Sequence, residues 1–181
     1  MTKNSLIYSL GDKVIHRSYG VGEIEGVEHK PIKGIEVECF KVKTENGHYW
    51  FPTEGLDHHR IHPVATQELV DMAIKIIRSA PQDLENDHLQ WKERIDIVQS
   101  NGDFLAISEL VRDLVALKTT KNLNQVQSQA LKTLEGRLLI EWAASSGVNV
   151  SSIRPKYRAY LSESKTYLQK DGKMKIKERS R

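Results

Sequence analysis

Residues 35–52 read IEVECFKVKTENGHYWFP, and their pattern predicts a β-hairpin in the first part of the chain. Apolar and charged side chains alternate from Ile35 to Cys39, as expected of a strand with one buried face. The apolar side then moves to Phe40 and Val42, which predicts a β-bulge in this strand. Asn46-Gly47 favours the left-handed conformations of a type I′ hairpin turn, so a second strand is expected to follow directly.

Further short strands are predicted before this hairpin. Lys13–His16 and Val21–Glu28 are strand candidates, and the residues around Gly20 have turn chemistry. We expect a break at residues 30–34, KPIKG, because proline lacks an amide hydrogen and glycine tolerates positive φ. Strands this short predict a small, open Tudor-like or SH3-like β-barrel that ends near Pro63.

Beyond Pro63 the apolar residues recur at helical spacing, which predicts an all-α domain. Asn101-Gly102 can end one helix in the left-handed conformation, and Asp103 can cap the next. The fold class is therefore α+β in separate domains. The expected domains are a Tudor-like domain at residues 1–63, a helical domain at 64–148, and a basic helical extension with a mobile tail at 149–181.

Charge is distributed unevenly along the chain, although the net charge is only +3. Residues 1–63 carry a net charge of −1 and residues 64–148 carry −3, whereas residues 149–181 carry 10 Lys or Arg against 3 Asp or Glu. Such a basic block is typical of contact with nucleic acid, and a solubilising tail is the alternative. Within a short helix expected from about residue 151 to residue 160, the candidate DNA-binding residues are Arg154, Lys156 and Arg158.

The cysteine and histidine residues of the chain do not show the spacing of a catalytic or metal site. Cys39 is the one cysteine of the chain, and it stands in a strand without a nearby base. The histidines within residues 58–62 favour a solvated turn over a metal site, because adjacent histidines point in different directions. We therefore expect no enzyme activity, no metal, no cofactor and no small-molecule substrate. No apolar run is long enough to cross a membrane, so we expect a cytoplasmic protein.

The three tryptophans have different sequence environments. Trp142 falls on the apolar stripe of a predicted helix, which favours a core position. Trp50 lies between Tyr49 and Phe51 in a strand, so an aromatic side chain must face outward there, as at a partner surface. Trp91 is flanked by the cations Lys92 and Arg94, which suits insertion between bases with phosphate contacts beside it. A core-capping position for Trp91 is equally consistent with its spacing.

Several of these segments resemble the CarD-like family, whose N-terminal module is shared with the polymerase-interacting domain of transcription-repair coupling factors. The similarity spans about residues 8–146. The matching segments are GDKVI at 11–15, YGVGEIEGV at 19–27, IKG at 32–34, Phe51-Pro52, NGD at 101–103 and ELVRDL at 109–114.

The resemblance implies a regulator that binds the RNA polymerase β subunit through Lys30, Ile32 and Trp50. It also implies a tryptophan wedge, here Trp91, that inserts into promoter double-stranded DNA at the upstream edge of the bubble. This contact is expected to stabilise the open complex. Binding to polymerase is expected to bring the protein to the nucleoid. Family members often carry arginine at the first and third of the polymerase-binding positions. An ungapped alignment places His88 at the wedge position instead. The alternative function is a polymerase-binding module without direct DNA contact.

Overall fold

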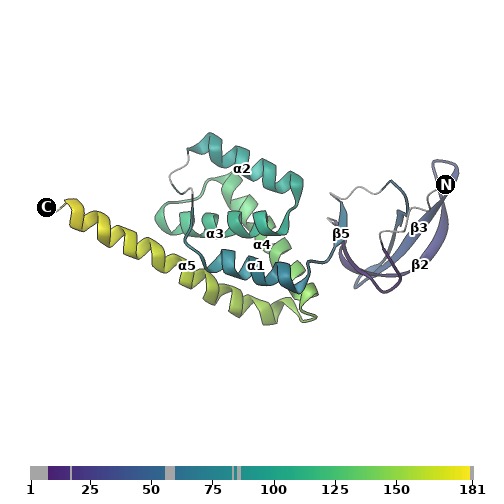
Figure 1. Cartoon of the computed structure of the whole chain (residues 1–181). Coiled ribbons are helices and arrows are strands. Elements are labelled where there is room, and N and C mark those ends of the chain that lie inside the picture. Colours follow the sequence, from purple (N-terminus) through teal and green to yellow (C-terminus); the bar gives the residue numbers. More distant parts are fainter. Residues whose placement is uncertain (1–7, 17, 56–59, 83, 85–86, 180–181) are drawn as a thin grey trace, which may run out of the picture. The chain divides into compact units, whose positions relative to one another are not determined.

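The computed structural model describes residues 8–16, 18–55, 60–82, 84 and 87–179, with the side chains of residues 101 and 168–179 left out. The chain forms two compact units, Met1–Val64 and Ala65–Arg181. We call them the strand unit and the helical unit. The predicted α+β class, with strands and helices in separate regions, is confirmed (Figure 1).

The strand unit is one antiparallel sheet with the order β4-β3-β2-β1-β5. Among the described residues β4 and β5 are its two edges and do not pair with each other, so the sheet is open. Its core is built from apolar and aromatic residues of all five strands and from Tyr8. The strands are β1 (Lys13–His16), β2 (Gly20–Ile32), β3 (Ile35–Thr44), β4 (Gly47–Pro52) and β5 (Ile61–Pro63).

The β2–β3 hairpin differs from the predicted pattern in two respects. β2 extends into the predicted break at residues 30–34 as far as Ile32, and the chain turns within that break at Lys33 and Gly34, a type I′ turn with φ of 51° and 82°. Pro31 is tolerated because β1 pairs with β2 only at residues 20–23, which leaves one side of β2 unpaired there. The predicted bulge in β3 is wrong: the register shift lies in β2, between Ile24 and Gly26.

The β3–β4 turn also differs from the prediction. Gly47 already pairs with Thr44 as the first residue of β4, and the turn consists of residues 45 and 46. Lys33 is the one non-glycine residue with positive φ in the described part of the chain, so Asn46 does not adopt the left-handed conformation. The predicted type I′ turn at Asn46-Gly47 is therefore wrong, although the hairpin itself is confirmed.

The glycine-rich segment of β2 has a packing role. A Cβ atom on Gly22 would lie 2.3 Å from Cγ1 of Val42 and 2.9 Å from the carbonyl oxygen of Lys43 on the neighbouring strand. Both distances are below real Cβ contacts, so a side chain at position 22 would push β3 away from β2.

In its described residues, the helical unit contains five helices around one apolar core (Figure 1). Asp103 caps α3 by accepting from the amide of Ala106, and Gly102 ends α2 in the left-handed conformation with φ 69°, both as predicted. None of the described helices is long and apolar enough to cross a membrane. The helices are α1 (Gln67–Arg78), α2 (His88–Asn101), α3 (Phe104–Thr120), α4 (Gln125–Ser145) and α5 (Val150–Arg179).

Helix α5 is longer than predicted and contributes to the core of the helical unit. It spans 30 residues, whereas the sequence predicted a helix of about ten. Ile153, Tyr157 and Leu161 are at most 6% exposed and belong to the same buried cluster as the residues of α1, α3 and α4. The rings of Tyr160 and Trp142 are stacked with their centres 6.1 Å apart. Trp142 is thus a core residue, as predicted.

Candidate functional site

A partly exposed cluster on β2, β3 and β4 contains Glu28, Lys30, Lys41 and Trp50, and we call it the Trp50 cluster. The ammonium nitrogen of Lys30 lies 4.3 Å from the centre of the Trp50 ring, within cation–π range. The indole Nε1 of Trp50 donates to Glu28 at 3.0 Å. The ammonium groups of Lys30 and Lys41 each lie 3.0 Å from a carboxylate oxygen of Glu28.

Glu28 is held as a carboxylate by these three donors. Hydrogen bonds from Lys30, Lys41 and Trp50 lower the pKa of Glu28 to about 2. Glu28 and Lys41 were not among the site residues predicted from the sequence. Their signal is the strand register: Lys41 lies opposite Trp50, and residues opposite each other in an antiparallel pair project to the same face.

The three residues expected to bind the polymerase lie on this one face. Lys30 and Ile32 are two residues apart in β2, so their side chains share a face, and Lys30 reaches Trp50 directly. Ile32 and Trp50 are each 39% exposed, and Ile35 is 69% exposed opposite Ile32 at the end of the hairpin. This face therefore combines the exposed apolar side chains of Ile32 and Ile35 with the Trp50 cluster.

Trp91 does not lie on the surface of the helical unit. Its side chain is 1% exposed and packs in the main apolar cluster with Ile95 and Val98 of the same helix. An indole in this position is inaccessible to bases, so of the two interpretations of Trp91 the structure supports the core position. The wedge interpretation fails because Trp91, Ile95 and Val98 form one buried stripe of α2 at helical spacing.

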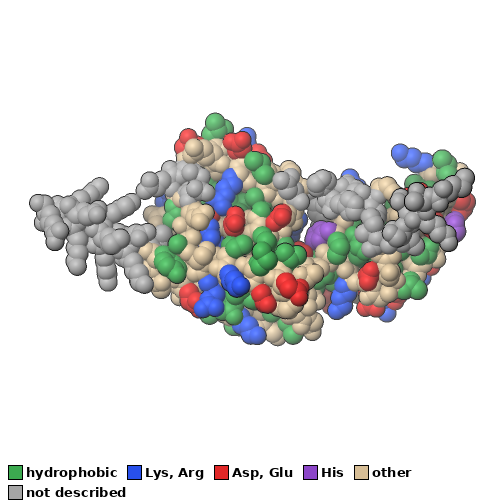
Figure 2. Space-filling view, in the orientation of Figure 1, with side chains coloured by type: hydrophobic (Ala, Val, Ile, Leu, Met, Phe, Trp, Pro, Cys, Tyr) green, Lys and Arg blue, Asp and Glu red, His purple; other side chains and the backbone are tan. Residues whose placement is uncertain are grey.

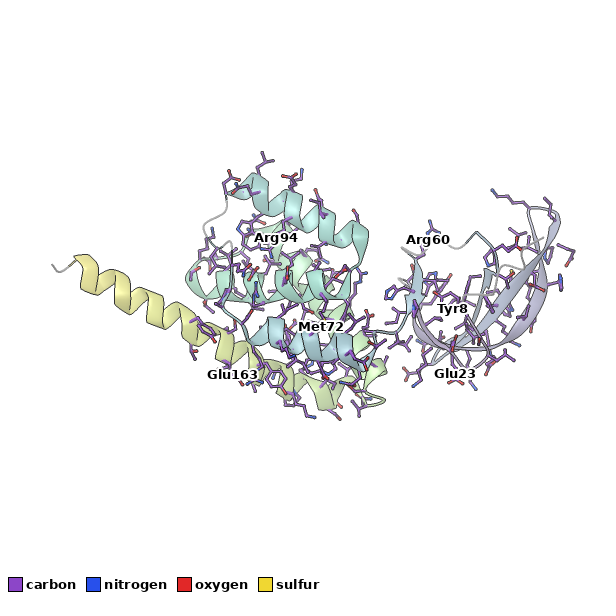
Figure 3. The ribbon with its side chains drawn as sticks, viewed as in Figure 1. Tyr8, Glu23, Arg60, Met72, Arg94 and Glu163 are labelled. Carbon is purple, nitrogen blue, oxygen red and sulfur yellow. The ribbon has the colours of Figure 1, made fainter. Side chains whose placement is uncertain are left out.

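Arg94 is likewise engaged inside the helical unit. Its Nη2 donates to Oδ2 of Asp113 at 2.6 Å, and its guanidinium carbon lies 5.6 Å from the centre of the Trp91 ring. Figure 3 shows Arg94 on the side of α2 that faces α3. The expected phosphate contact of Arg94 would require this ion pair with a fully buried carboxylate to break.

Exposed residues at the start of α2 are the remaining DNA-contact candidates on this helix. His88 is the first residue of α2, directly after the N-cap Asp87, and it is exposed. Lys92 is exposed one turn later, on the same side of the helix as His88. Leu89, between them in sequence, is 71% exposed.

On α5 the three candidate cations are exposed, but they do not share one face. Arg154 and Arg158 are one turn apart and project to the same side, whereas Lys156 projects to another side of the helix. Figure 2 shows Lys and Arg side chains interspersed with Asp and Glu over the α1 and α5 region of the helical unit. Arg78 of α1 and Glu163 of α5 form an ion pair in this region, with Nε of Arg78 2.7 Å from Oε2 of Glu163.

The described residues offer no arrangement for metal binding. His58 and His59, part of the histidine-rich stretch, lie outside the described residues. His62 is half-buried in β5, where its Nδ1 contacts the carbonyl oxygen of Pro63 at 3.0 Å. Cys39 is fully buried, and burial raises the pKa of its thiol, which opposes formation of a nucleophilic thiolate.

Comparison with known proteins identifies the strand unit. Residues 8–65 match the CarD-like/TRCF RID domain, which is an RNA polymerase-interacting domain. The chain is also 26% identical over 154 residues to a Bacillus subtilis (strain 168) protein named "Putative transcription factor YdeB". That alignment covers 82% of this chain and 98% of YdeB, so the similarity extends well beyond the strand unit.

Proposed function

From the CarD-like RNA polymerase-interacting domain at residues 8–65, we propose that this protein is a transcription regulator that binds the polymerase β subunit. The observation that carries the proposal is the Trp50 cluster on the surface of that domain. Trp50 supplies a large amphipathic contact, and Ile32 supplies an apolar one. Interfaces depend on a few such anchors, which are surrounded by contacts that exclude water.

The helical unit is proposed to contact promoter DNA at the upstream edge of the bubble. The residues that we propose for this contact are His88, Leu89 and Lys92, which are exposed at the start of α2. A ring and an aliphatic side chain beside a cation can pack against opened base steps while the cation holds a phosphate. Arg154 and Arg158, on one side of α5, would add phosphate contacts without base specificity.

This mechanism requires no catalytic step. A protein that binds the open complex more tightly than the closed complex shifts the equilibrium toward the open complex by that difference in affinity. The Trp50 cluster would supply an anchor common to both states, and the start of α2 would supply contacts available only in the opened state. Stabilisation of the open complex follows from the second set of contacts alone.

A polymerase-binding module that does not touch DNA is the second candidate. Two observations favour it: residues 64–148 carry a net charge of −3, and Arg94 is committed to Asp113. Under this alternative the helical unit would contact polymerase or another protein, and the basic residues of α5 would serve solubility.

A bridging experiment separates the two candidates. Immobilised polymerase β fragment is incubated with the full chain and then with labelled promoter DNA carrying an unpaired bubble. The proposal predicts DNA retention only when the chain is present, loss of retention for Trp50→Ala, and reduced retention for His88→Ala with chain binding intact. Retention of the chain without any DNA would support the second candidate, and failure of the chain to bind β would contradict both.

A further inference from the structure

The carboxylate of Asp113 joins three parts of the helical unit. Asp113 is fully buried on α3, and its Oδ1 accepts from Nε of Arg112 at 2.7 Å and from the backbone amide of Gln82 at 2.9 Å. Its Oδ2 accepts from Nη2 of Arg94 on α2 at 2.6 Å. Because a buried charge is costly unless it is paired and hydrogen-bonded, this geometry is strongly favoured over arrangements that leave a partner out.

The pair of Arg94 and Asp113 fixes the rotation of α2 about its axis. Arg94 lies on one flank of the buried stripe that contains Trp91, whereas His88 and Lys92 lie on the other flank, at the 100° per residue of an α-helix. Rotation of α2 that carried His88 inward or farther outward would pull Arg94 away from Asp113. The contact of Arg94 with Asp113, on one flank of the buried stripe, therefore sets how far His88 and Lys92 on the other flank are exposed.

The same buried network extends to α5. Nη1 of Arg112 donates to the hydroxyl of Ser79 at 2.7 Å, directly after α1. The hydroxyl of Ser164 on α5, which is 1% exposed, donates to the carbonyl oxygen of Ser79 at 2.7 Å. A continuous chain of hydrogen bonds and chain segments thus runs from α5 through Ser79, Arg112 and Asp113 to Arg94.

We infer that Arg94 and Asp113 are positioning residues that orient the start of α2, with Ser164 supporting them from α5. Arg94 contributes to DNA binding by holding the helix that carries His88 and Lys92, and does not itself bind a phosphate. This inference rests on the proposed contact of α2 with promoter DNA, and it assigns to Arg94 a role different from the one that its position beside Lys92 suggests.

The test compares full-length variants by two measurements. Arg94→Met removes the ion pair but keeps a long side chain over Trp91, Arg94→Lys restores a cation, and Lys92→Met removes a surface cation of the proposed interface. Amide hydrogen exchange of α2 reports how firmly the helix is held. Affinity for forked and for fully paired duplex DNA, each over a range of salt concentrations, reports the DNA contact.

The expected results differ between the variants. Arg94→Met should speed exchange of α2 amides and reduce the preference for forked DNA about five-fold, within the range measured for residues that act at a distance. Its salt dependence should stay unchanged, whereas Lys92→Met should reduce the slope of log affinity against log salt by about one. Arg94→Lys should restore most of the preference, and Ser164→Ala should speed exchange of α2 less than Arg94→Met does. Lys75→Met, an exposed cation on α1, is the matched control for loss of charge.

Three results would overturn the inference. A salt slope reduced by about one in Arg94→Met, as in Lys92→Met, would mean that Arg94 binds a phosphate directly. Unchanged exchange of α2 in Arg94→Met would mean that the pair does not hold the helix. A preference for forked DNA that is unchanged although exchange is faster would limit the pair to a structural role. If the wild-type chain shows no preference for forked DNA, the proposed α2 contact itself fails, and exchange still decides whether Arg94 holds α2.

Discussion

The ammonium group of Lys30 lies over the ring of Trp50, 4.3 Å from its centre, and both side chains also contact the carboxylate of Glu28. The indole is therefore held in a defined orientation before any partner arrives. A pre-oriented aromatic side chain loses less conformational entropy on binding than a mobile one. This arrangement supports the proposal that the polymerase binds to this face of the sheet.

Removal of the indole should weaken polymerase binding without unfolding the strand unit. Trp50→Ala should cost about 1–3 kcal/mol of binding free energy, as expected of an anchor residue. The stability of the unit should change little, since Trp50 is outside the apolar core that includes Phe40 and Phe51. Titration calorimetry with a β fragment measures the effect, and Val126→Ala on the helical unit serves as the control. Unchanged affinity of Trp50→Ala would remove the cluster from the interface.

Much of the fold was predictable because caps and turns depend on neighbouring residues. Asp103 and Gly102 mark a helix boundary through their own backbone and side-chain preferences, and the structure places both as predicted. The extension of β2 past Pro31 to Ile32 and the length of α5 were not predicted, for a different reason. Pairing of β2 with β3 overrides the local signal of Pro31, and packing of Tyr157 in the core stabilises a helix whose composition is strongly polar.

The site was predictable only in part, because a cation near a tryptophan in the sequence has the same local pattern whether it is exposed or buried. Arg94 beside Trp91 suits phosphate binding when both are exposed, and a buried ion pair when both face the core. The partner that decides between them, Asp113, is 19 residues away in the sequence. By contrast, Lys30 and Trp50 meet through strand pairing, although local patterns did not reveal that Glu28 joins them.

Trp91 and Trp142 should now behave alike in stability experiments. They are 1% and 4% exposed in the same core, so replacement of either by alanine should cost about 3–5 kcal/mol of folding free energy. Urea unfolding followed by far-ultraviolet circular dichroism measures both. A Trp91→Ala variant that keeps wild-type stability but loses DNA binding would restore the wedge interpretation of Trp91.

Two truncations of α5 should have different consequences. Removal of residues 167–181 takes away six Lys or Arg and two Asp or Glu, and should lower the salt dependence of DNA binding by about one for each phosphate that these cations neutralise. Thermal stability should be retained. Removal of residues 149–181 also deletes Ile153, Tyr157 and Leu161 from the core, so the helical unit should be strongly destabilised. Equal thermal stability of the two truncated proteins would contradict the packing of α5.

Glu141 should make the stability of the helical unit depend on pH. Burial raises the pKa of this carboxyl from 4.5 to about 7, against the opposing effects of the Ala65 amide and Arg137, and Asp103 raises it further. The folded state therefore holds the proton more tightly than the unfolded chain, and stability falls as pH rises from about 4.5 to about 7. The loss amounts to about 3 kcal/mol.

Glu141→Gln isolates this effect, because glutamine keeps an oxygen that can accept from the Ala65 amide. The free energy of unfolding of the variant minus that of the wild type should be larger at pH 8 than at pH 4.5. Urea unfolding of both proteins at both pH values measures this difference. A difference between the two proteins that does not change with pH would show that Glu141 does not titrate in this range.

Stabilisation of the open complex can be measured as the lifetime of the complex that purified RNA polymerase forms on a promoter. This lifetime should be measured with and without this protein at a concentration that saturates binding to β. The lifetime should be longer with the wild-type protein, unchanged with Trp50→Ala, and only partly lengthened with His88→Ala. An unchanged or shortened lifetime, with the wild-type protein demonstrably bound to polymerase, would contradict stabilisation of the open complex.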